Sequence, residues 1–357
     1  MPSPPSADDR QLYESFYGLH ANPFKLEPDP CFLYHSSSHD RVAQDVMTAL
    51  RRRAAAILVT GESGIGKTML CRTIVDQLDR RTLTSFVTDS RVSAESLLRT
   101  VLVDFGVISR GRAQKADHHE LTDALRSFLA SLATLQASAV LIVDDAHTLA
   151  MPALEQVRLL SELGAADRPL QVLLVGDPDL ATTLRRAELK ALDRRIALRC
   201  RLEPLARVEV AGYVMHRVAV AGTRARINFD DGALARVFEL SDGVPRVVNM
   251  ICDRALTLGQ HTAASVIQRE LIDQAATDIE VRRARGERHG LVRALAAALM
   301  FLLLMILGAA ASAWIFSDVI RQTIAEWRSI PPAPESPVRR LPAPLAPLPM
   351  PEGMPER

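Results

Sequence analysis

The sequence predicts an α/β fold, in which a parallel sheet lies between two layers of helices. A small helical bundle and then one transmembrane helix are expected to follow it. Three observations carry this prediction. Short apolar runs that suit buried strands alternate with helical segments between residues 55 and 202. A glycine-rich loop joins the first of these strands to a helix. Residues 294–317 form an apolar run without a charged side chain.

The composition is that of a globular protein with one large or two modest domains: 357 residues, 48% hydrophobic and 24% charged. Lys and Arg (43) nearly balance Asp and Glu (42), so no overall basic field indicates a nucleic-acid partner. The four cysteines are scattered without a C-x-x-C pair, which argues against a metal site or a disulfide framework. The polar, proline-rich start of the chain does not resemble a cleavable signal peptide.

Residues 1–38 are predicted to form an N-terminal lead-in. Its segment from Tyr13 to Tyr34 is aromatic and punctuated by prolines. This segment has two interpretations, a strap that covers the first helix or one wall of an adenine pocket, and the residues leave both open. A helix is predicted from about His39 to Arg53, at the start of an α/β domain expected to span residues 39–205.

The glycine-rich loop fits the pattern G-x-x-x-x-G-K-[ST], with the sequence Gly61-Glu62-Ser63-Gly64-Ile65-Gly66-Lys67-Thr68. Its small side chains let successive backbone N–H groups surround a β-phosphate at the start of the next helix. Lys67 is predicted to neutralise the β- and γ-phosphates, and the Thr68 hydroxyl to hold Mg²⁺. Because strand, glycine turn and helix follow in the required order, a chance glycine turn is disfavoured.

A second apolar run, Ala139 to Val143, ends in Asp144 and Asp145, which is typical of a Walker B strand. Asp144 is expected to hold Mg²⁺ through its water shell, and Asp145 to polarise the attacking water. Aspartate is also a common helix N-cap, which is the alternative explanation. The position of the run downstream of a P-loop favours the Walker B interpretation.

The remaining strands are predicted at about Leu83–Asp89, Leu170–Val175 and Ile196–Leu202. Asp177 follows the second of these, at the carboxyl edge of the sheet, where ligands of open α/β folds gather. Helices are predicted between the strands, at Ala94–Gly106, His119–Gln136 and Ala153–Gly164. The polar connection that contains His118 and His119 is interpreted as a solvated loop.

Residues 206–281 show helical periodicity and no strand, which predicts a small helical bundle. The helical segments lie near Val208–Val220, Asp231–Ser241, Pro245–Leu258 and Arg269–Ile279. Pro245 fits the first position of a helix. Arg246 is therefore expected to point back toward whatever lies at the start of that helix.

A membrane anchor is predicted after a basic linker at residues 282–293. The uncharged run at 294–317 is long enough to cross a hydrocarbon core of about 30 Å. Arginines are denser before this span than after it, which places the N-terminal part in the cytoplasm and the C-terminal tail in the periplasm, with a single pass through the inner membrane. Residues 318–330 are predicted to form an amphipathic helix on the outer membrane surface. The proline-rich residues 331–357 are expected to form a disordered tail.

Further motifs accompany the P-loop: Asn22-Pro23-Phe24, Pro28-Asp29-Pro30, Phe32-Leu33-Tyr34, Leu170–Gly176, Arg195-Ile196, Gly243–Asn249 and Cys252–Leu256. With them, the chain resembles the AAA+ ATPases of the general secretion pathway protein A (ExeA-type) family. That family has relatives in pilus-biogenesis and exosortase-associated exopolysaccharide loci. The resemblance covers about Tyr13 to Asp278.

The resemblance implies a P-loop AAA+ core with strand order 5-1-4-3-2, a C-terminal helical lid and activity as an oligomer. It implies that Arg246 is the lid arginine that touches the γ-phosphate. It also implies that Arg195 is offered to the neighbouring subunit's nucleotide, with Arg194 and Arg199 as weaker candidates. For Arg195, the alternative is an ordinary surface salt bridge.

Three features depart from the family's usual pattern. Asp145 is one methylene shorter than the usual Glu, so turnover is expected to be slow. Asp177 stands where relatives commonly have Gln, which puts an acceptor where a phosphate needs a donor. Repulsion follows unless Asp177 holds water or an arginine. The chain also has no peptidoglycan-binding domain after the span, so peptidoglycan binding is not carried over.

The leading hypothesis is a membrane-anchored ATPase that binds and hydrolyses ATP with Mg²⁺. Its nucleotide-dependent oligomers, a ring or a partial ring, are expected to support assembly of an envelope secretion or exopolysaccharide-export system with a partner protein. A first alternative is a nucleotide-gated scaffold with little turnover, which Asp145 and Asp177 motivate. A second is a DNA-transaction helper of the transposition type, which the near-neutral charge and the membrane span oppose.

Overall fold

The computed structural model describes residues 13–88, 92–163, 169–223, 225–279 and 305. The chain divides into two compact units, Met1–Gly286 and Glu287–Arg357, and of the second only Met305 is described. The linker at 282–293, the segment at 318–330, the tail at 331–357 and all of the predicted span at 294–317 except Met305 therefore lie outside the described residues. Within the described ranges, no helix has the length and apolar character needed to cross a bilayer.

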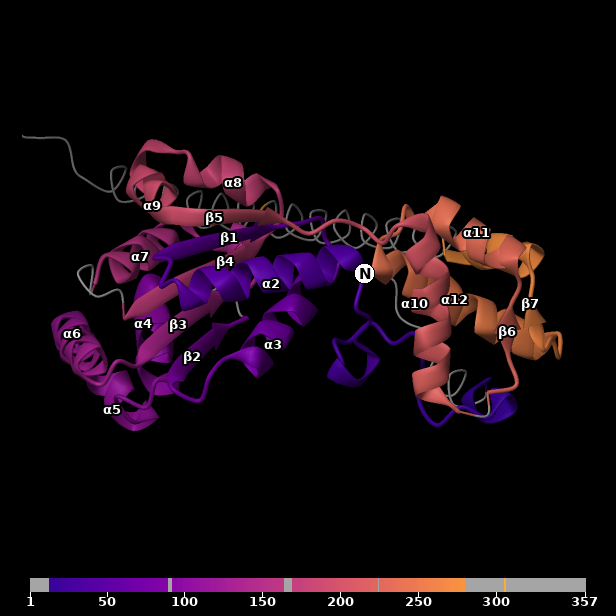
Figure 1. Ribbon diagram of the computed structural model, residues 1–357, viewed down its shortest axis with the longest axis horizontal. Helices are drawn as coiled ribbons and strands as arrows, with labels where there is room; N and C mark the ends of the chain where they lie inside the picture. The colour runs from indigo at the N-terminus through magenta and orange to yellow at the C-terminus, as the bar shows by residue number, and fades with distance from the viewer. Residues whose placement is uncertain (1–12, 89–91, 164–168, 224, 280–304, 306–357) are drawn as a thin grey trace, which may run out of the picture. The chain divides into compact units, whose positions relative to one another are not determined.

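A sheet of five parallel strands forms the centre of the α/β part (Figure 1). The strands are β1 (Ala56–Thr60), β2 (Thr82–Val87), β3 (Ser138–Val143), β4 (Leu170–Gly176) and β5 (Ile196–Arg201). Their spatial order is β2-β3-β4-β1-β5, and all neighbours are parallel. Read from the β5 edge, this is the predicted order 5-1-4-3-2, which is confirmed. The first residues after β1, β3 and β4 consequently lie at one edge of the sheet.

Helices cover both faces of the sheet (Figure 1). Successive side chains of a strand point to opposite faces, so alternate residues belong to different cores. On one face, α2 (Ser37–Arg51) and α3 (Lys67–Gln77) pack against Ile57 and Val59 of β1. On the other, α4 (Ala94–Asp104), α6 (His118–Thr134) and α7 (Met151–Glu162) pack in the core that contains Ala56 and Leu58. The predicted three-layer arrangement is confirmed.

Several short helices were not predicted from the sequence. The connection interpreted as a solvated loop contains α5 (Arg110–Lys115), and His118 and His119 already belong to the first turn of α6, which Asp117 caps. The other short elements are α8 (Asp179–Leu184), α9 (Lys190–Arg195), and the 3-10 turns η1 (Pro30–Phe32), η2 (Ala146–Thr148) and η3 (Ala187–Leu189). Elements of one or two turns are too short to display a helical period, so pattern reading misses them.

Residues 207–279 contain the expected helices: α10 (Arg207–Ala221), α11 (Asp231–Ser241), α12 (Pro245–His261) and helical residues 269–279. The prediction that this region contains no strand is wrong. β6 (Asn228–Phe229) and β7 (Val266–Ile267) pair in parallel, with Phe229 opposite Ile267. Two residues cannot show the alternation that marks a strand, and the pairing arises only when the segments before α11 and after α12 come together.

Four aromatic side chains of the lead-in are buried in the core of this helical region. Tyr13, Tyr17, Phe24 and Phe32 belong to the same apolar cluster as the inner faces of α10, α11 and α12. The interpretation as a strap over the first helix does not explain these contacts. The helices against which the lead-in packs are α10, α11 and α12, which follow the α/β part in the sequence. This packing positions Lys25 to Tyr34 beside the P-loop.

Candidate functional site

The P-loop runs from the end of β1 to the start of α3 and is tied down at both ends. The Gly61 N–H donates to the carbonyl of Gly176 on β4 at 3.1 Å, and Ile65 is buried in the core beneath α3. Gly64 and Gly66 have φ angles of +83° and +107°, which favour glycine. No side chain fills the space where a Cβ of Gly66 would lie. The loop therefore presents backbone rather than bulk at the start of α3, which is what a phosphate site requires.

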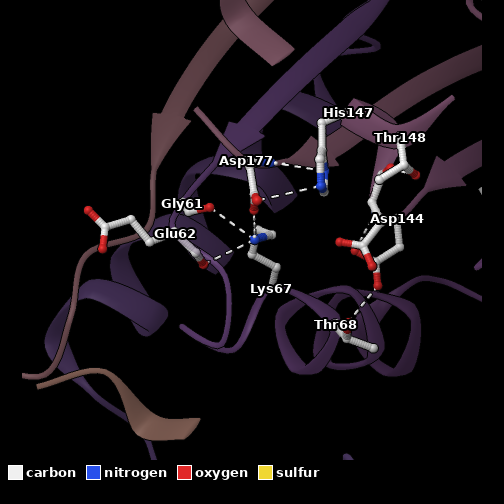
Figure 2. Close-up of polar contacts among 9 residues, drawn as sticks. Gly61, Glu62, Lys67, Thr68, Asp144, His147, Thr148 and Asp177 are labelled. Atoms are coloured by element: carbon white, nitrogen blue, oxygen red, sulfur yellow. Dashed lines mark hydrogen bonds and ion pairs between the residues drawn. The ribbon is translucent and has the colours of Figure 1, made fainter. Parts of the chain in front are cut away.

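Lys67 is buried, and its ammonium is fully engaged within the chain. Nζ donates to the carbonyl oxygens of Gly61 at 2.9 Å and Glu62 at 3.0 Å. It also lies 2.5 Å from Oδ1 of Asp177, the residue that follows β4 (Figure 2). The sequence placed Asp177 at this edge of the sheet, and the structure adds that it pairs with the P-loop lysine. The sequence did not predict Lys67 as the cation that pairs with Asp177.

His147 completes this cluster from the turn after β3. Its Nδ1 accepts a hydrogen bond from the Asp177 N–H at 3.3 Å, and its Nε2 lies 3.4 Å from Asp177 Oδ2 (Figure 2). His147 can lie this close to the end of β4 because the strand ends in a glycine. A Cβ on Gly176 would lie 3.2 Å from the backbone nitrogen of His147. The sequence indicates no role for His147, because this residue reaches Asp177 only through the pairing of β3 with β4.

Thr68 and Asp144 lie together, as a shared metal site requires. Thr68 Oγ1 donates to Asp144 Oδ2 at 2.6 Å (Figure 2). Asp144 is 3% exposed; burial raises the pKa of its carboxyl above the ordinary value, and the Thr68 hydrogen bond partly offsets this. A buried carboxylate beside a hydroxyl is a donor set that suits Mg²⁺. These two residues fit the metal that the sequence predicted for them.

Asp145 is exposed and lines the cavity in front of the P-loop. Its φ of +48° puts it in the left-handed region, which aspartate tolerates better than most residues. Its carbonyl accepts hydrogen bonds from the N–H and hydroxyl of Thr148, at 2.9 and 2.7 Å. This backbone conformation gives a physical reason for Asp rather than Glu at the position.

The two predicted arginines are placed differently. The Arg246 N–H donates to the Gly64 carbonyl at 3.1 Å, and its exposed side chain lines the same cavity as the P-loop. The helix it belongs to begins at Pro245, as predicted. Arg195 is not among the residues that line this cavity: its Nη2 donates to the Ser161 carbonyl on α7 at 2.6 Å. Of the weaker candidates, Arg194 is exposed and Arg199 pairs with Asp193 at 2.8 Å.

A cavity of about 260 Å³ opens in front of the P-loop. The lead-in, the P-loop residues 63–68, and α10 and α12 of the helical region line it. The lead-in is held there by the buried Arg217, which donates to the Pro23 and Lys25 carbonyls and lies 4.9 Å from the centre of the Phe32 ring. Of the two interpretations of the lead-in, the pocket wall is the one these contacts favour.

His39 also lines this cavity and was not singled out by the sequence analysis. It is 6% exposed, and neither ring nitrogen has a hydrogen-bond partner among the residues that the structure describes. Burial lowers the pKa of its imidazole below the ordinary value, partly offset by the nearby Asp40. No sequence pattern indicates that a histidine in the first turn of an amphipathic helix lines a cavity.

Comparisons with known proteins agree with the fold and the motifs. A family model described as an AAA domain matches residues 50–184. The chain is 34% identical over 291 residues to general secretion pathway protein A of Aeromonas hydrophila, an alignment that covers 81% of this chain and 52% of that protein. The chain therefore spans about half the length of this curated relative.

Solved structures share the architecture. The ORC1 protein of Aeropyrum pernix, solved in complex with DNA, matches with a TM-score of 0.55 and 15% identity over 72% of this chain and 69% of that one. The ORC2 protein of the same organism, solved as ADPNP–ADP complexes, matches with a TM-score of 0.51 and 14% identity over 71% and 72%. At these identities the likeness concerns the fold alone. The P-loop geometry, the AAA domain match and the identity to general secretion pathway protein A support one conclusion: the chain contains an AAA domain and is related to general secretion pathway protein A over most of its own length.

Proposed function

We propose that this chain binds ATP with Mg²⁺ in the cavity in front of the P-loop and hydrolyses it. The observation that carries the proposal is the contact of Thr68 Oγ1 with Asp144 Oδ2 at 2.6 Å, immediately beside the open glycine loop. Two residues far apart in the sequence thereby form a site for a divalent cation next to a site for phosphate.

Each residue of the site has a defined task in this proposal. The N–H groups of residues 61–68 bind the phosphates, and Lys67 neutralises their charge. Thr68 and Asp144 hold Mg²⁺, which supplies positive charge to the phosphate oxygens when it is bound. Asp145 orients and polarises the attacking water. Arg246 reaches the γ-phosphate from the helical region, and Arg195 serves a neighbouring copy, for which it has to leave the Ser161 carbonyl.

The cellular setting belongs to the same proposal. We place the ATPase at the inner membrane as a nucleotide-dependent oligomer that supports assembly of an envelope secretion or exopolysaccharide-export system. The uncharged run at 294–317 and the arginines before it motivate the anchor and its orientation. The identity to a general secretion pathway protein motivates the choice of system.

One observation favours a second candidate, a nucleotide-gated scaffold with little turnover. Asp177 holds Lys67 at 2.5 Å, so the lysine that has to meet the phosphates is already paired with an anion. Tight ATP binding and ATP-dependent oligomers with negligible phosphate release would favour this candidate over the enzyme.

The test measures phosphate release by the purified full-length chain with Mg-ATP. Lys67→Ala is expected to abolish release, while Lys115→Ala, which removes an exposed lysine of α5, should leave it unchanged. Equal rates in the wild type and Lys67→Ala would refute the enzymatic proposal. For the anchor, the chain is expected to stay with membrane vesicles in alkaline carbonate, and its release into the wash would refute membrane insertion.

A further inference from the structure

The carboxylate of Asp177 occupies the P-loop lysine. An ammonium has three N–H donors, and those of Lys67 go to the Gly61 carbonyl, the Glu62 carbonyl and Asp177 Oδ1. The lysine side chain is 6% exposed and the aspartate 29%, so the pair is partly shielded from water. As long as Asp177 stays, no donor of Lys67 is left for a phosphate oxygen.

This arrangement affects the two adenine nucleotides unequally. The β-phosphate, the last phosphate of ADP, is bound by the backbone N–H groups of the loop in addition to Lys67, so ADP keeps ligands that Asp177 does not block. The γ-phosphate of ATP approaches Lys67 from the side where the Asp177 carboxylate already lies. Two negative charges beside the same partly shielded ammonium repel each other. ATP therefore has to displace Asp177, whereas ADP has far less need to.

His147 is the group that can receive the displaced carboxylate. Its Nδ1 accepts the Asp177 N–H, which leaves the proton of the neutral ring on Nε2. That nitrogen lies 3.4 Å from Asp177 Oδ2, whereas Lys67 Nζ contacts Oδ1 (Figure 2). A rotation of the Asp177 side chain alone shifts the carboxylate from the ammonium toward the imidazole.

On the basis of the proposed function, we propose that Asp177 is a specificity-determining residue for ATP against ADP. Its carboxylate holds Lys67 where the γ-phosphate would bind. ATP binding moves the carboxylate to His147, and ADP binding leaves it where it is. Asp177 thus weakens ATP relative to ADP, and His147 limits that weakening.

The test compares the dissociation constants of the full-length chain for Mg-ADP and Mg-ADPNP, measured by calorimetry. Asp177→Asn keeps the shape and removes the charge. It is expected to tighten ADPNP by about tenfold and to change ADP by less than about threefold. Asp179→Asn removes one exposed negative charge from the same sheet edge, without contact to Lys67, and is expected to leave the ratio of the two constants unchanged.

The role of His147 is tested by a double-mutant cycle. His147→Ala alone is expected to weaken ADPNP severalfold and to spare ADP, because the carboxylate loses its second partner. In the Asp177→Asn background, the same substitution should have little effect on ADPNP. Equal effects of His147→Ala in both backgrounds would show that it acts on the fold and not through Asp177.

The outcomes separate this inference from the proposed function. If the wild type binds neither nucleotide, or if Lys67→Ala binds both as tightly, the proposed function fails. If the wild type binds both and Asp177→Asn leaves the ratio unchanged or weakens ADPNP, only the inference about Asp177 fails. Asp177→Gln, which also removes the charge, provides a second variant if Asp177→Asn does not melt cooperatively, and the same shift of the ratio is expected.

Discussion

The two ends of the cavity differ in how their buried polar groups are satisfied. At the P-loop end, Lys67, Thr68 and Asp144 all have hydrogen-bond partners within the chain. At the lead-in end, formed by residues 25–34 and His39, the buried imidazole of His39 has no such partner within the described part of the chain. A buried polar group without a partner costs about 1–3 kcal/mol.

This difference separates two tasks of a binding site. The P-loop end keeps its geometry without a ligand because its own side chains satisfy one another, which is the preorganisation that phosphate chemistry needs. It also means that a ligand has to displace existing contacts there. The lead-in end has an unsatisfied group instead, so a ligand that supplies a hydrogen bond gains affinity there without breaking one. Substitutions at each end of the cavity, and at the junction between the ends, test this difference.

The largest effect is expected for Asp144→Asn at the P-loop end. The variant keeps the size of the side chain and removes the anionic ligand for Mg²⁺, so phosphate release should fall by a factor on the order of 10²–10³. Stability should not fall with it, because burial raises the pKa of Asp144 and therefore disfavours its charge. Phosphate release against Mg²⁺ concentration and a melting curve measure both effects.

Asp179→Asn is the matched control for charge, since Asp179 lies at the same edge of the sheet but is exposed. A near-wild-type rate of Asp144→Asn with the same Mg²⁺ requirement would contradict the metal assignment. A large loss of melting temperature would instead show that the carboxylate is structural.

A smaller effect is expected for Gly64→Ala at the junction between the two ends. The added Cβ would lie 2.6 Å from the Arg246 Cβ, and φ is +83°. The strain and the displaced start of α12 together should lower the free energy of unfolding by about 2 kcal/mol. The midpoint of urea unfolding reports the change.

Gly106→Ala isolates the backbone part of this effect. Gly106 has a φ of +71°, and nothing lies within 4 Å of the place where its Cβ would be. Its substitution should cost only about 1 kcal/mol. Equal shifts of the two midpoints would mean that the contact of Gly64 with Arg246 contributes nothing.

Local patterns explain why the P-loop end could be predicted from the sequence. The glycine loop, the Asp144-Asp145 run and the proline before Arg246 are each contiguous, and each has a fixed place at the end of a strand or the start of a helix. The strand order came from the family resemblance and is confirmed. Thr68 and Asp144 then meet because β1 and β3 both pair with β4.

The partners of these residues could not be predicted in the same way. Lys67 and Asp177 are 110 residues apart, and their contact depends on the rotamers that the start of α3 and the end of β4 leave open. Arg195 stands at the expected place in the chain, yet packing against α7 decides where its guanidinium points. His39 shares its cavity with residues of the lead-in and of α10, and the neighbouring Ser37 N–H donates to Glu209 of α10; neither contact leaves a periodic signal in the sequence.

The smallest effect concerns His39 at the lead-in end and is a pH dependence of stability. Burial lowers the pKa of His39 in the folded chain below its unfolded value of about 6.5. Above that value both states are neutral and the group has no effect. As the pH falls below it, the unfolded chain takes up a proton that the folded chain resists, so the free energy of unfolding decreases by at most about 1.4 kcal/mol per pH unit. The decrease ends once the pH passes below the folded pKa.

His39→Leu removes both the unsatisfied nitrogens and this proton uptake. The urea midpoints of His39→Leu and the wild type are compared at pH 7.5, 6.5 and 5.5, values chosen at roughly one-unit steps about the unfolded pKa. The midpoint of His39→Leu should rise relative to that of the wild type as the pH falls. The exposed His261, changed to Gln, should keep the wild-type pH dependence. A difference between His39→Leu and the wild type that is the same at all three pH values would show that the imidazole is not held neutral. The ring nitrogens of His39 would then have hydrogen-bond partners without a ligand, and the two ends of the cavity would no longer differ in this respect.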